Sequence, residues 1–219
     1  MTPSGIIFDL DGTLTDSRPG LLAGLRHMHD HMGWERPSDG ELLRWLGPPT
    51  ATILAEAGHP PAVVADAVGA FRAKLDAGAL FESRLYDGVE PLLAELHAAG
   101  RPLGVATHKI QRDAEAVIRH YRLTDRFLGV HGRVADEASH SKAPVIARAA
   151  ASMGLPAVEL VMVGDRINDI ASAHELGMRS IGVAYGYGGR AELEDAGATH
   201  VVDSVDELAA LLVGELAAR

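Results

Sequence analysis

The sequence contains no cysteine. Disulfide bonds, catalysis by a thiolate and zinc sites built from cysteine are therefore excluded. Aromatic residues make up only 5% of the 219 residues, whereas hydrophobic residues as a whole make up 47%. This composition excludes the disordered class and suits helices packed on a sheet better than an aromatic-rich β-sandwich. The length allows one sizeable core, or a core with a modest insertion.

The sequence also lacks an excess of basic residues, since its formal net charge is -10. An acidic chain repels a phosphate backbone, so we expect no nucleic acid polymer among its partners. No apolar run approaches the roughly 20 residues of a membrane helix, and the N-terminus does not resemble a signal peptide. We therefore expect a cytoplasmic protein with no membrane partner. A small anionic substrate would need a local positive site, from a metal ion or from a few lysines and arginines.

Short apolar runs recur along the chain and predict buried strands. They are too short for most helices and too apolar for a half-exposed antiparallel sheet, so a parallel sheet covered on both faces fits best. The runs are Ile6–Leu10, Pro102–Ala106, Phe127–His131, Leu160–Val163, Ser180–Val183 and the short Val201–Val202.

Helical periodicity fills the intervals between these runs from residue 88 onward. Alternating strands and helices predict an α/β fold, a doubly wound parallel sheet. From about Ser17 to Tyr86 the sequence shows helical periodicity and no good strand. We therefore expect an α/β core of residues 1–16 and 88–219 with an all-helical cap, residues 17–87, inserted after the first strand.

Two carboxylates follow the first strand, in the stretch Asp9-Leu10-Asp11-Gly12-Thr13. The carboxyl end of a strand faces the ligand crevice in an open α/β sheet. Alternation along a strand places Asp9 and Asp11 on one face, and Gly12 permits a tight turn away from the sheet. Clustered carboxylates at such a place suit a hard cation such as Mg²⁺.

A second apolar strand also ends in a carboxylate, Asp165, and Asp169 follows in the first turn of a helix. A simple capping charge is the alternative interpretation of Asp169, and the recurrence of the same strand-end pattern weakens it. Thr107 ends the second predicted strand and precedes a helix, so its hydroxyl and nearby backbone N–H groups are candidates to hold a phosphoryl oxygen. Lys142, just before another helix, is a candidate cation, although most lysines are solvated.

In this order the motifs resemble those of the haloacid dehalogenase superfamily, and the resemblance covers almost the whole chain. The helical insert resembles the first cap class of that family. Four shorter stretches are similar to its phosphoglycolate phosphatase-like branch: residues 46–49, 86–89, 162–170 and 182–188.

The resemblance implies a Mg²⁺-dependent phosphatase for small phosphate monoesters, such as phosphoglycolate or a nucleoside 5′-monophosphate. Asp9 would be the nucleophile that forms an aspartyl-phosphate, and Asp11 the general acid and then the base. The metal would lie on the carboxylates of Asp9 and Asp165 and on the backbone carbonyl of Asp11. Asp169 would hold a metal-bound water or Lys142.

The resemblance further implies that Thr107 and Lys142 neutralise the phosphoryl oxygens. In the members of this family that break carbon–halogen bonds, a tyrosine stands where this chain has Asp11, because a halide leaves without a proton. The resemblance therefore implies that an aspartate at this position favours phosphoryl transfer. His108 departs from the asparagine or serine that is common after the motif threonine, and it is a candidate substrate contact. Arg44, in the cap, is another.

Two alternatives remain open from the sequence. A sugar-phosphate mutase resembling β-phosphoglucomutase would use the same aspartates but return the phosphoryl group to a sugar. A non-catalytic binding protein could keep the fold, although it would be expected to lose part of the catalytic set. The sequence is compatible with a monomer and with a homodimer.

Overall fold

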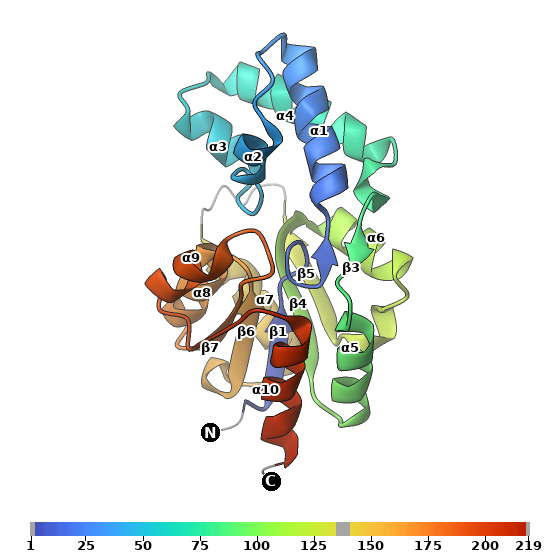
Figure 1. The fold of residues 1–219 in the computed structure, drawn as a ribbon, viewed down its shortest axis with the longest axis vertical. Coiled ribbons are helices and arrows are strands. Elements are labelled where there is room, and N and C mark those ends of the chain that lie inside the picture. The colour runs from blue at the N-terminus through green and yellow to red at the C-terminus, as the bar shows by residue number, and fades with distance from the viewer. Residues whose placement is uncertain (1–2, 135–140, 218–219) are drawn as a thin grey trace. The chain divides into compact units, whose positions relative to one another are not determined.

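The computed structural model describes residues 3–134 and 141–217 (Figure 1). Its main feature is a six-stranded sheet in the order β5-β4-β1-β6-β7-β8, in which the strand pairings are parallel. The strands of this sheet are β1 (Gly5–Phe8), β4 (Leu103–Ile110), β5 (Gly129–Arg133), β6 (Leu160–Gly164), β7 (Arg179–Val183) and β8 (His200–Val202). The predicted fold class, a doubly wound α/β sheet, is confirmed.

Helices lie between these strands in the chain, because parallel neighbours cannot be joined by a tight hairpin. The α-helices of this part of the chain are α5 (Val89–Ala98), α6 (Gln111–His120), α7 (Ala143–Met153), α8 (Ile167–Glu175), α9 (Gly189–Asp195) and α10 (Val205–Ala217). Two short 3₁₀ turns accompany them, η2 (Thr124–Arg126) and η3 (Ala157–Glu159), and a third, η1 (Ala79–Phe81), lies elsewhere in the chain.

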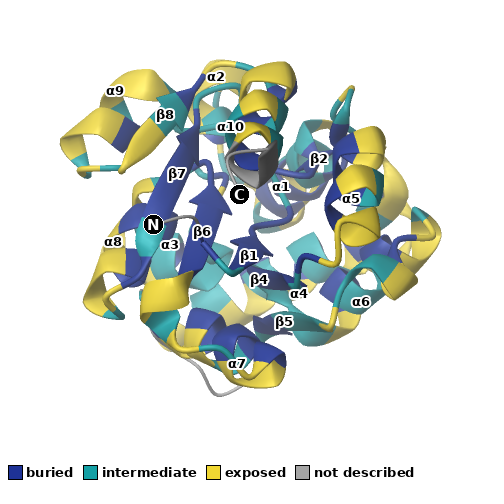
Figure 2. Ribbon diagram, turned by 90° about the horizontal axis from the view of Figure 1, so that it is seen from below, coloured by how far each residue is buried: buried dark blue, intermediate teal, exposed yellow. Residues whose placement is uncertain are grey.

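The central strands β1 and β6 are fully buried, whereas the edge strands β5 and β8 are only partly buried. The outer faces of the helices are exposed (Figure 2). One core cluster joins the sheet to α7 and α8, and it includes Ile7 of β1, Met162 of β6, Ile146 of α7 and Ala173 of α8. All four are less than 1% exposed, so this face of the sheet is fully covered. Burial of apolar side chains on this scale is the main source of the stability of this part of the fold.

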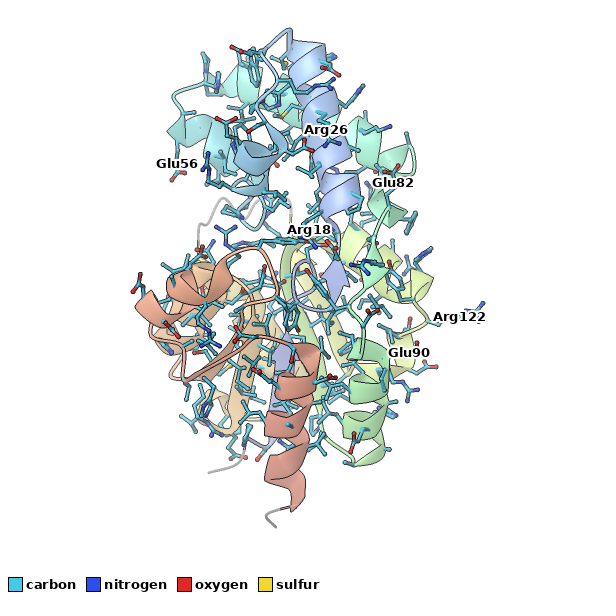
Figure 3. All side chains as sticks on the ribbon, viewed as in Figure 1. Arg18, Arg26, Glu56, Glu82, Glu90 and Arg122 are labelled. Atoms are coloured by element: carbon cyan, nitrogen blue, oxygen red, sulfur yellow. The ribbon has the colours of Figure 1, made fainter. Side chains whose placement is uncertain are left out.

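The chain divides into two compact units, residues 1–15 with 85–219 and residues 16–84. The second unit contains α1 (Arg18–Met32), α2 (Asp39–Leu43), α3 (Thr50–Glu56), α4 (Pro61–Asp76) and η1. Figure 3 shows charged side chains projecting outward from each unit, for example Arg122 in the first and Glu56 in the second.

Local sequence explains the helices of the second unit. Ser38 and Glu41 form a capping box that starts α2, and Gly33 ends α1 in the left-handed conformation. Gly24 of α1 faces Phe71 of α4, and a methyl group at Gly24 would lie 2.7 Å from that ring. A glycine at this position therefore lets α1 and α4 pack closely.

The structure differs from the sequence-based expectation in two places. Thr107 lies inside β4, which continues to Ile110, so the helix does not begin directly after it. A two-stranded sheet of β2 (Thr15–Asp16) and β3 (Arg84–Leu85) occurs where no strand was expected.

Candidate active site

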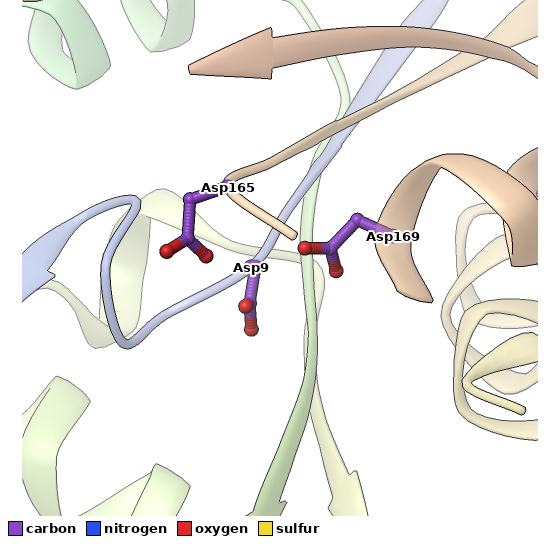
Figure 4. A group of neighbouring side chains, drawn as sticks. All are labelled: Asp9, Asp165 and Asp169. Carbon is purple, nitrogen blue, oxygen red and sulfur yellow. The ribbon is translucent and has the colours of Figure 1, made fainter. Parts of the chain in front are cut away.

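Three carboxylates meet at the carboxyl end of the sheet (Figure 4). Asp9 follows β1, Asp165 follows β6, and Asp169 lies in the first turn of α8. One oxygen from each carboxylate lies within 4.8 Å of the others. All three residues are buried, with exposed fractions of 7%, 0% and 1% respectively.

The register of the central strands produces this convergence. Phe8, the last residue of β1, pairs with Val105 of β4 on one side and Val163 of β6 on the other. The backbone N–H of Asp9 then donates to the carbonyl of Val163 at 2.8 Å. Because parallel strands end at the same edge, the residues that follow them are brought together there.

The turn after Asp9 is held by backbone hydrogen bonds and by a glycine. The N–H groups of Leu14 and Thr15 both donate to the carbonyl of Leu10 at 2.9 Å. Gly12 has a φ of 84°, and a methyl group there would lie 2.1 Å from an oxygen of Asp165. Both the left-handed backbone and the lack of space require glycine at this position.

Asp165 and Asp169 are fixed by different donors. Asp165 Oδ2 accepts the N–H of Tyr187 at 2.7 Å, while its buried Oδ1 has no hydrogen-bond partner among the residues that the structure describes. Asp169 Oδ2 accepts the N–H of Arg166 at 3.0 Å, and its Oδ1 accepts the ammonium of Lys142 at 2.5 Å. The unpaired oxygen of Asp165 is therefore available as a metal ligand.

Lys142 is the cation of this site, and it is buried instead of solvated. Its side chain is 2% exposed, and its Nζ lies 2.8 Å from Asp9 Oδ1 as well as 2.5 Å from Asp169 Oδ1. Its backbone N–H donates to Ser172 Oγ at 2.9 Å, which fixes the start of α7 against α8. Such a lysine must be paired, because an isolated buried charge is very costly.

The electrostatics of the cluster show a shortage of positive charge. Burial raises the pKa of Asp9 from 3.8 to about 6, while Lys142 lowers it and Asp169 raises it further. Burial, followed by Asp9 and Asp169, also raises the pKa of Asp165 well above its usual value. Burial alone lowers the pKa of Lys142, but Asp169 and Asp9 outweigh burial and raise it.

Three carboxylates facing one ammonium carry two uncompensated negative charges when they are ionised. A divalent cation bound by oxygen ligands would neutralise them, and it would give Asp165 Oδ1 its missing partner. The buried aspartate cluster is therefore compatible with a divalent metal ion, as is typical of proteins with this donor set.

Asp11 pairs with a different cation, Lys109. Its carboxylate oxygens lie 2.8 and 3.1 Å from the ammonium of Lys109, which is 6% exposed. Thr107 is buried on the same strand, and its Oγ1 accepts the N–H of Lys109 at 3.2 Å. Lys109 was not among the residues predicted from the sequence, where its spacing of two residues from Thr107 was the only signal.

Two further candidates from the sequence, His108 and Arg44, are described by their place in the fold and their exposure. His108, between Thr107 and Lys109 on β4, is partly exposed. Arg44 is exposed and follows α2 in the second unit, so its role as a substrate contact stays a prediction. A further residue that the sequence did not indicate is Glu192, whose Oε1 accepts the N–H of Ile167 and the Nε of Arg166, both at 2.8 Å.

In the part of the chain that the structure describes, no helix has both the length and the apolar character needed to cross a bilayer.

Comparison with known proteins identifies the class. The chain matches the family of haloacid dehalogenase-like hydrolases over residues 6–183, and it belongs to that family. The resemblance inferred from the motifs is therefore confirmed.

Three individual relatives are similar to this chain over most of its length. The chain is 37% identical to the tyrosine-protein kinase PtkA of Mycobacterium tuberculosis, over 94% of this chain and 72% of that protein. It is 34% identical to a 5′-nucleotidase of Pseudomonas aeruginosa, over 89% of each chain. It is 31% identical to a phosphoglycolate phosphatase of Aliivibrio fischeri, over 94% of this chain and 95% of that one.

A solved structure shows the same fold over nearly the whole chain. It is that of a predicted phosphatase from Clostridium acetobutylicum, with a TM-score of 0.92 and 32% identity, covering 98% of this chain and 100% of the other.

Proposed function

We propose that this protein is a magnesium-dependent phosphatase that hydrolyses small phosphate monoesters through an aspartyl-phosphate on Asp9. The observation that carries the proposal is the position of Asp9. Its carboxylate lies at the carboxyl end of the central strand, 2.8 Å from a buried lysine and beside two further buried aspartates. The similarity to a 5′-nucleotidase and to phosphoglycolate phosphatases supports the same activity.

In the first step of the proposed reaction, a carboxylate oxygen of Asp9 attacks phosphorus. Asp9 Oδ1 already accepts hydrogen bonds from the N–H of Leu10 and from Lys142, so we assign the attack to Oδ2. The bond from phosphorus to the ester oxygen breaks, and the departing oxygen takes a proton from the carboxyl group of Asp11.

In the second step, water attacks phosphorus and gives a proton to the Asp11 carboxylate. The bond between phosphorus and Asp9 breaks, which releases phosphate and restores the carboxylate. Lys142 and the hydroxyl of Thr107 would stabilise the phosphoryl oxygens, since phosphoryl transfer depends mainly on positioning and electrostatics.

The chain's own residues fit a magnesium ion. Asp9 and Asp165 would hold it, together with the backbone carbonyl of Asp11, and Asp169 would support it through a bound water or through Lys142. When bound, the ion supplies positive charge that offsets the charge on the phosphoryl group. Asp165 Oδ1, which is buried and without a partner among the described residues, supports this assignment.

The substrate class is a small phosphorylated metabolite. We propose that the second unit, residues 16–84, acts as a cap that excludes large substrates and that Arg44 contributes to the choice among small ones. Phosphoglycolate and nucleoside 5′-monophosphates are the first esters to test, because they correspond to the activities named for the relatives.

The test is phosphate release from a panel of monoesters, with magnesium and with a chelator. The panel contains phosphoglycolate, nucleoside 5′-monophosphates, sugar phosphates and p-nitrophenyl phosphate. We expect turnover of several small esters that stops on chelation. If no ester releases phosphate but a hexose phosphate is isomerised in the presence of a bisphosphate activator, the enzyme is a mutase instead.

A second candidate is transfer of the phosphoryl group to a tyrosine hydroxyl. The observation in its favour is the 37% identity to PtkA over 94% of this chain. Incubation with labelled ATP and a tyrosine-containing peptide tests it. Label on the peptide that depends on Asp9 would support this candidate, and label found only as free phosphate would support the phosphatase.

A further inference from the structure

Lys109 and Asp11 form an ion pair that is almost withdrawn from solvent. The ammonium of Lys109 lies 2.8 Å from one oxygen of Asp11 and 3.1 Å from the other. The side chains are only 6% and 16% exposed. Exposed ion pairs contribute little because water screens them, whereas a pair this deeply placed holds both side chains in one geometry.

An irregularity near the end of β4 places the side chain of Lys109 beside Asp11. The register between β4 and β5 shifts between Ala106 and Ile110, so residues 107–109 leave the regular ladder. In this segment the N–H of Lys109 donates to Thr107 Oγ1 at 3.2 Å, which ties the backbone of Lys109 to a buried neighbour. Such a bulge re-aims a side chain near a functional site.

We propose that Lys109 is a positioning residue, one that orients the carboxyl group of Asp11 for the two proton transfers. This inference rests on the proposed phosphatase reaction. An ammonium only donates hydrogen bonds. When Asp11 carries a proton, Lys109 therefore holds the other oxygen, and the O–H turns away from the ammonium toward the ester oxygen.

The same contact serves the second step. After the proton has left, Lys109 keeps the carboxylate in place to accept the proton that the attacking water loses. A displacement of about 1 Å of a catalytic group can cost about 100-fold in rate, so a positioning residue has a measurable effect on turnover. Lys109 acts through Asp11 and need not touch the substrate.

The test compares two esters that differ in their need for a proton. An alkyl phosphate loses a basic alkoxide, which requires the proton of Asp11, whereas p-nitrophenyl phosphate loses a phenolate that can depart without one. For Lys109→Met we expect kcat/KM to fall about 100-fold on the alkyl ester and less than about 10-fold on p-nitrophenyl phosphate, with KM changed less than about threefold.

Two variants complete the comparison. Lys109→Arg keeps a cation that can donate to both oxygens of Asp11, so we expect it to restore part of the activity on the alkyl ester. Arg119→Met is the matched control, because Arg119 lies on α6 in an exposed pair with Glu115 at 3.8 Å and should leave both esters unaffected. If Lys109→Met does not fold, Lys109→Gln is expected to show the same dependence on the ester.

The outcomes separate the inference from the reaction on which it rests. Equal losses on both esters with an increase in KM would make Lys109 a substrate-binding residue and overturn its positioning role. A Lys109→Met enzyme as active as the wild type would overturn it as well, while the phosphatase assignment stood. A wild type that releases phosphate from neither ester would refute the phosphatase reaction itself, and the role of Lys109 in it would be refuted too.

Discussion

The ammonium of Lys142 lies 2.8 Å from Asp9 Oδ1, and both side chains are buried. This contact places a fixed positive charge beside the proposed nucleophile. It also makes Lys142 a structural residue, because it compensates the charge of Asp9 and Asp169 together. We therefore expect the proposed reaction and the stability of the fold to depend on the same side chain.

Removal of the Lys142 charge should destabilise the protein as well as inactivate it. Lys142→Met leaves Asp9 and Asp169 buried without their cation, and loss of one partner of a buried pair costs about 3–5 kcal/mol. Urea unfolding without magnesium at pH 7.5 measures this loss. The control is Lys74→Met on α4, which should change the unfolding free energy by less than about 0.5 kcal/mol. Equal stability of the two variants would contradict the charge balance described here.

Gly164 should tolerate no side chain, because of its position beside Asp169. A methyl group at Gly164 would lie 2.2 Å from the carboxylate carbon of Asp169. Gly164→Ala should therefore displace this carboxylate and lower activity by at least about 100-fold, the cost of a displacement of about 1 Å.

A second glycine provides the matched control for Gly164. Gly69, inside helix α4, has open space around it, so Gly69→Ala should keep full activity and add about 0.5–1 kcal/mol of stability. Assays of both variants on one ester make the comparison. An active Gly164→Ala enzyme would show that Asp169 is not held as the structure has it.

Magnesium should stabilise the protein more at pH 7.5 than at pH 5. The pKa of Asp9 is raised to about 6 in the folded protein without metal, against 3.8 ordinarily, so the folded state holds this proton more tightly than the unfolded state. This group therefore contributes stability that is present at low pH and is lost as the pH rises through about 6.

Above that pH the buried charge is uncompensated, and a cation relieves it. The raised pKa of Lys142 lies above this range, so its contribution is the same at both pH values. Thermal melts with and without magnesium at pH 5 and pH 7.5 provide the measurement. At 100 times the dissociation constant, bound magnesium should contribute about 2.7 kcal/mol. An equal rise in Tm at both pH values would argue against binding at Asp9.

The sequence predicted the parts of the site that follow strand ends. Asp9 and Asp165 each follow an apolar run, and a parallel sheet brings such positions together wherever the rest of the chain goes. An interval of about 70 residues with helical period and no apolar run led us to expect a helical cap, and helices α1, α2, α3 and α4 lie in that interval. These features depend on local pattern, which a sequence displays directly.

What the sequence did not show depends on packing between distant segments. Lys142 can be buried because Ser172 of α8 accepts a hydrogen bond from its backbone N–H and Asp169 of α8 accepts one from its ammonium. Neither contact is visible in the sequence, where a lysine is normally expected to be exposed. Lys109 reaches Asp11 only because β4 continues beyond Ala106 with a shifted register. Strands β2 and β3 have two residues each, which is too short for any periodic signal.

In the proposed reaction, Asp9 carries the phosphoryl group during turnover. The most direct measurement is mass spectrometry of the peptide that contains Asp9, after the enzyme is mixed with p-nitrophenyl phosphate and magnesium and quenched in acid within one turnover. We predict a phosphoryl adduct on Asp9 in the wild type, and neither adduct nor phosphate release in Asp9→Asn. An Asp9→Asn enzyme that keeps full activity, or an adduct on another residue, would contradict the assignment of Asp9 as the nucleophile.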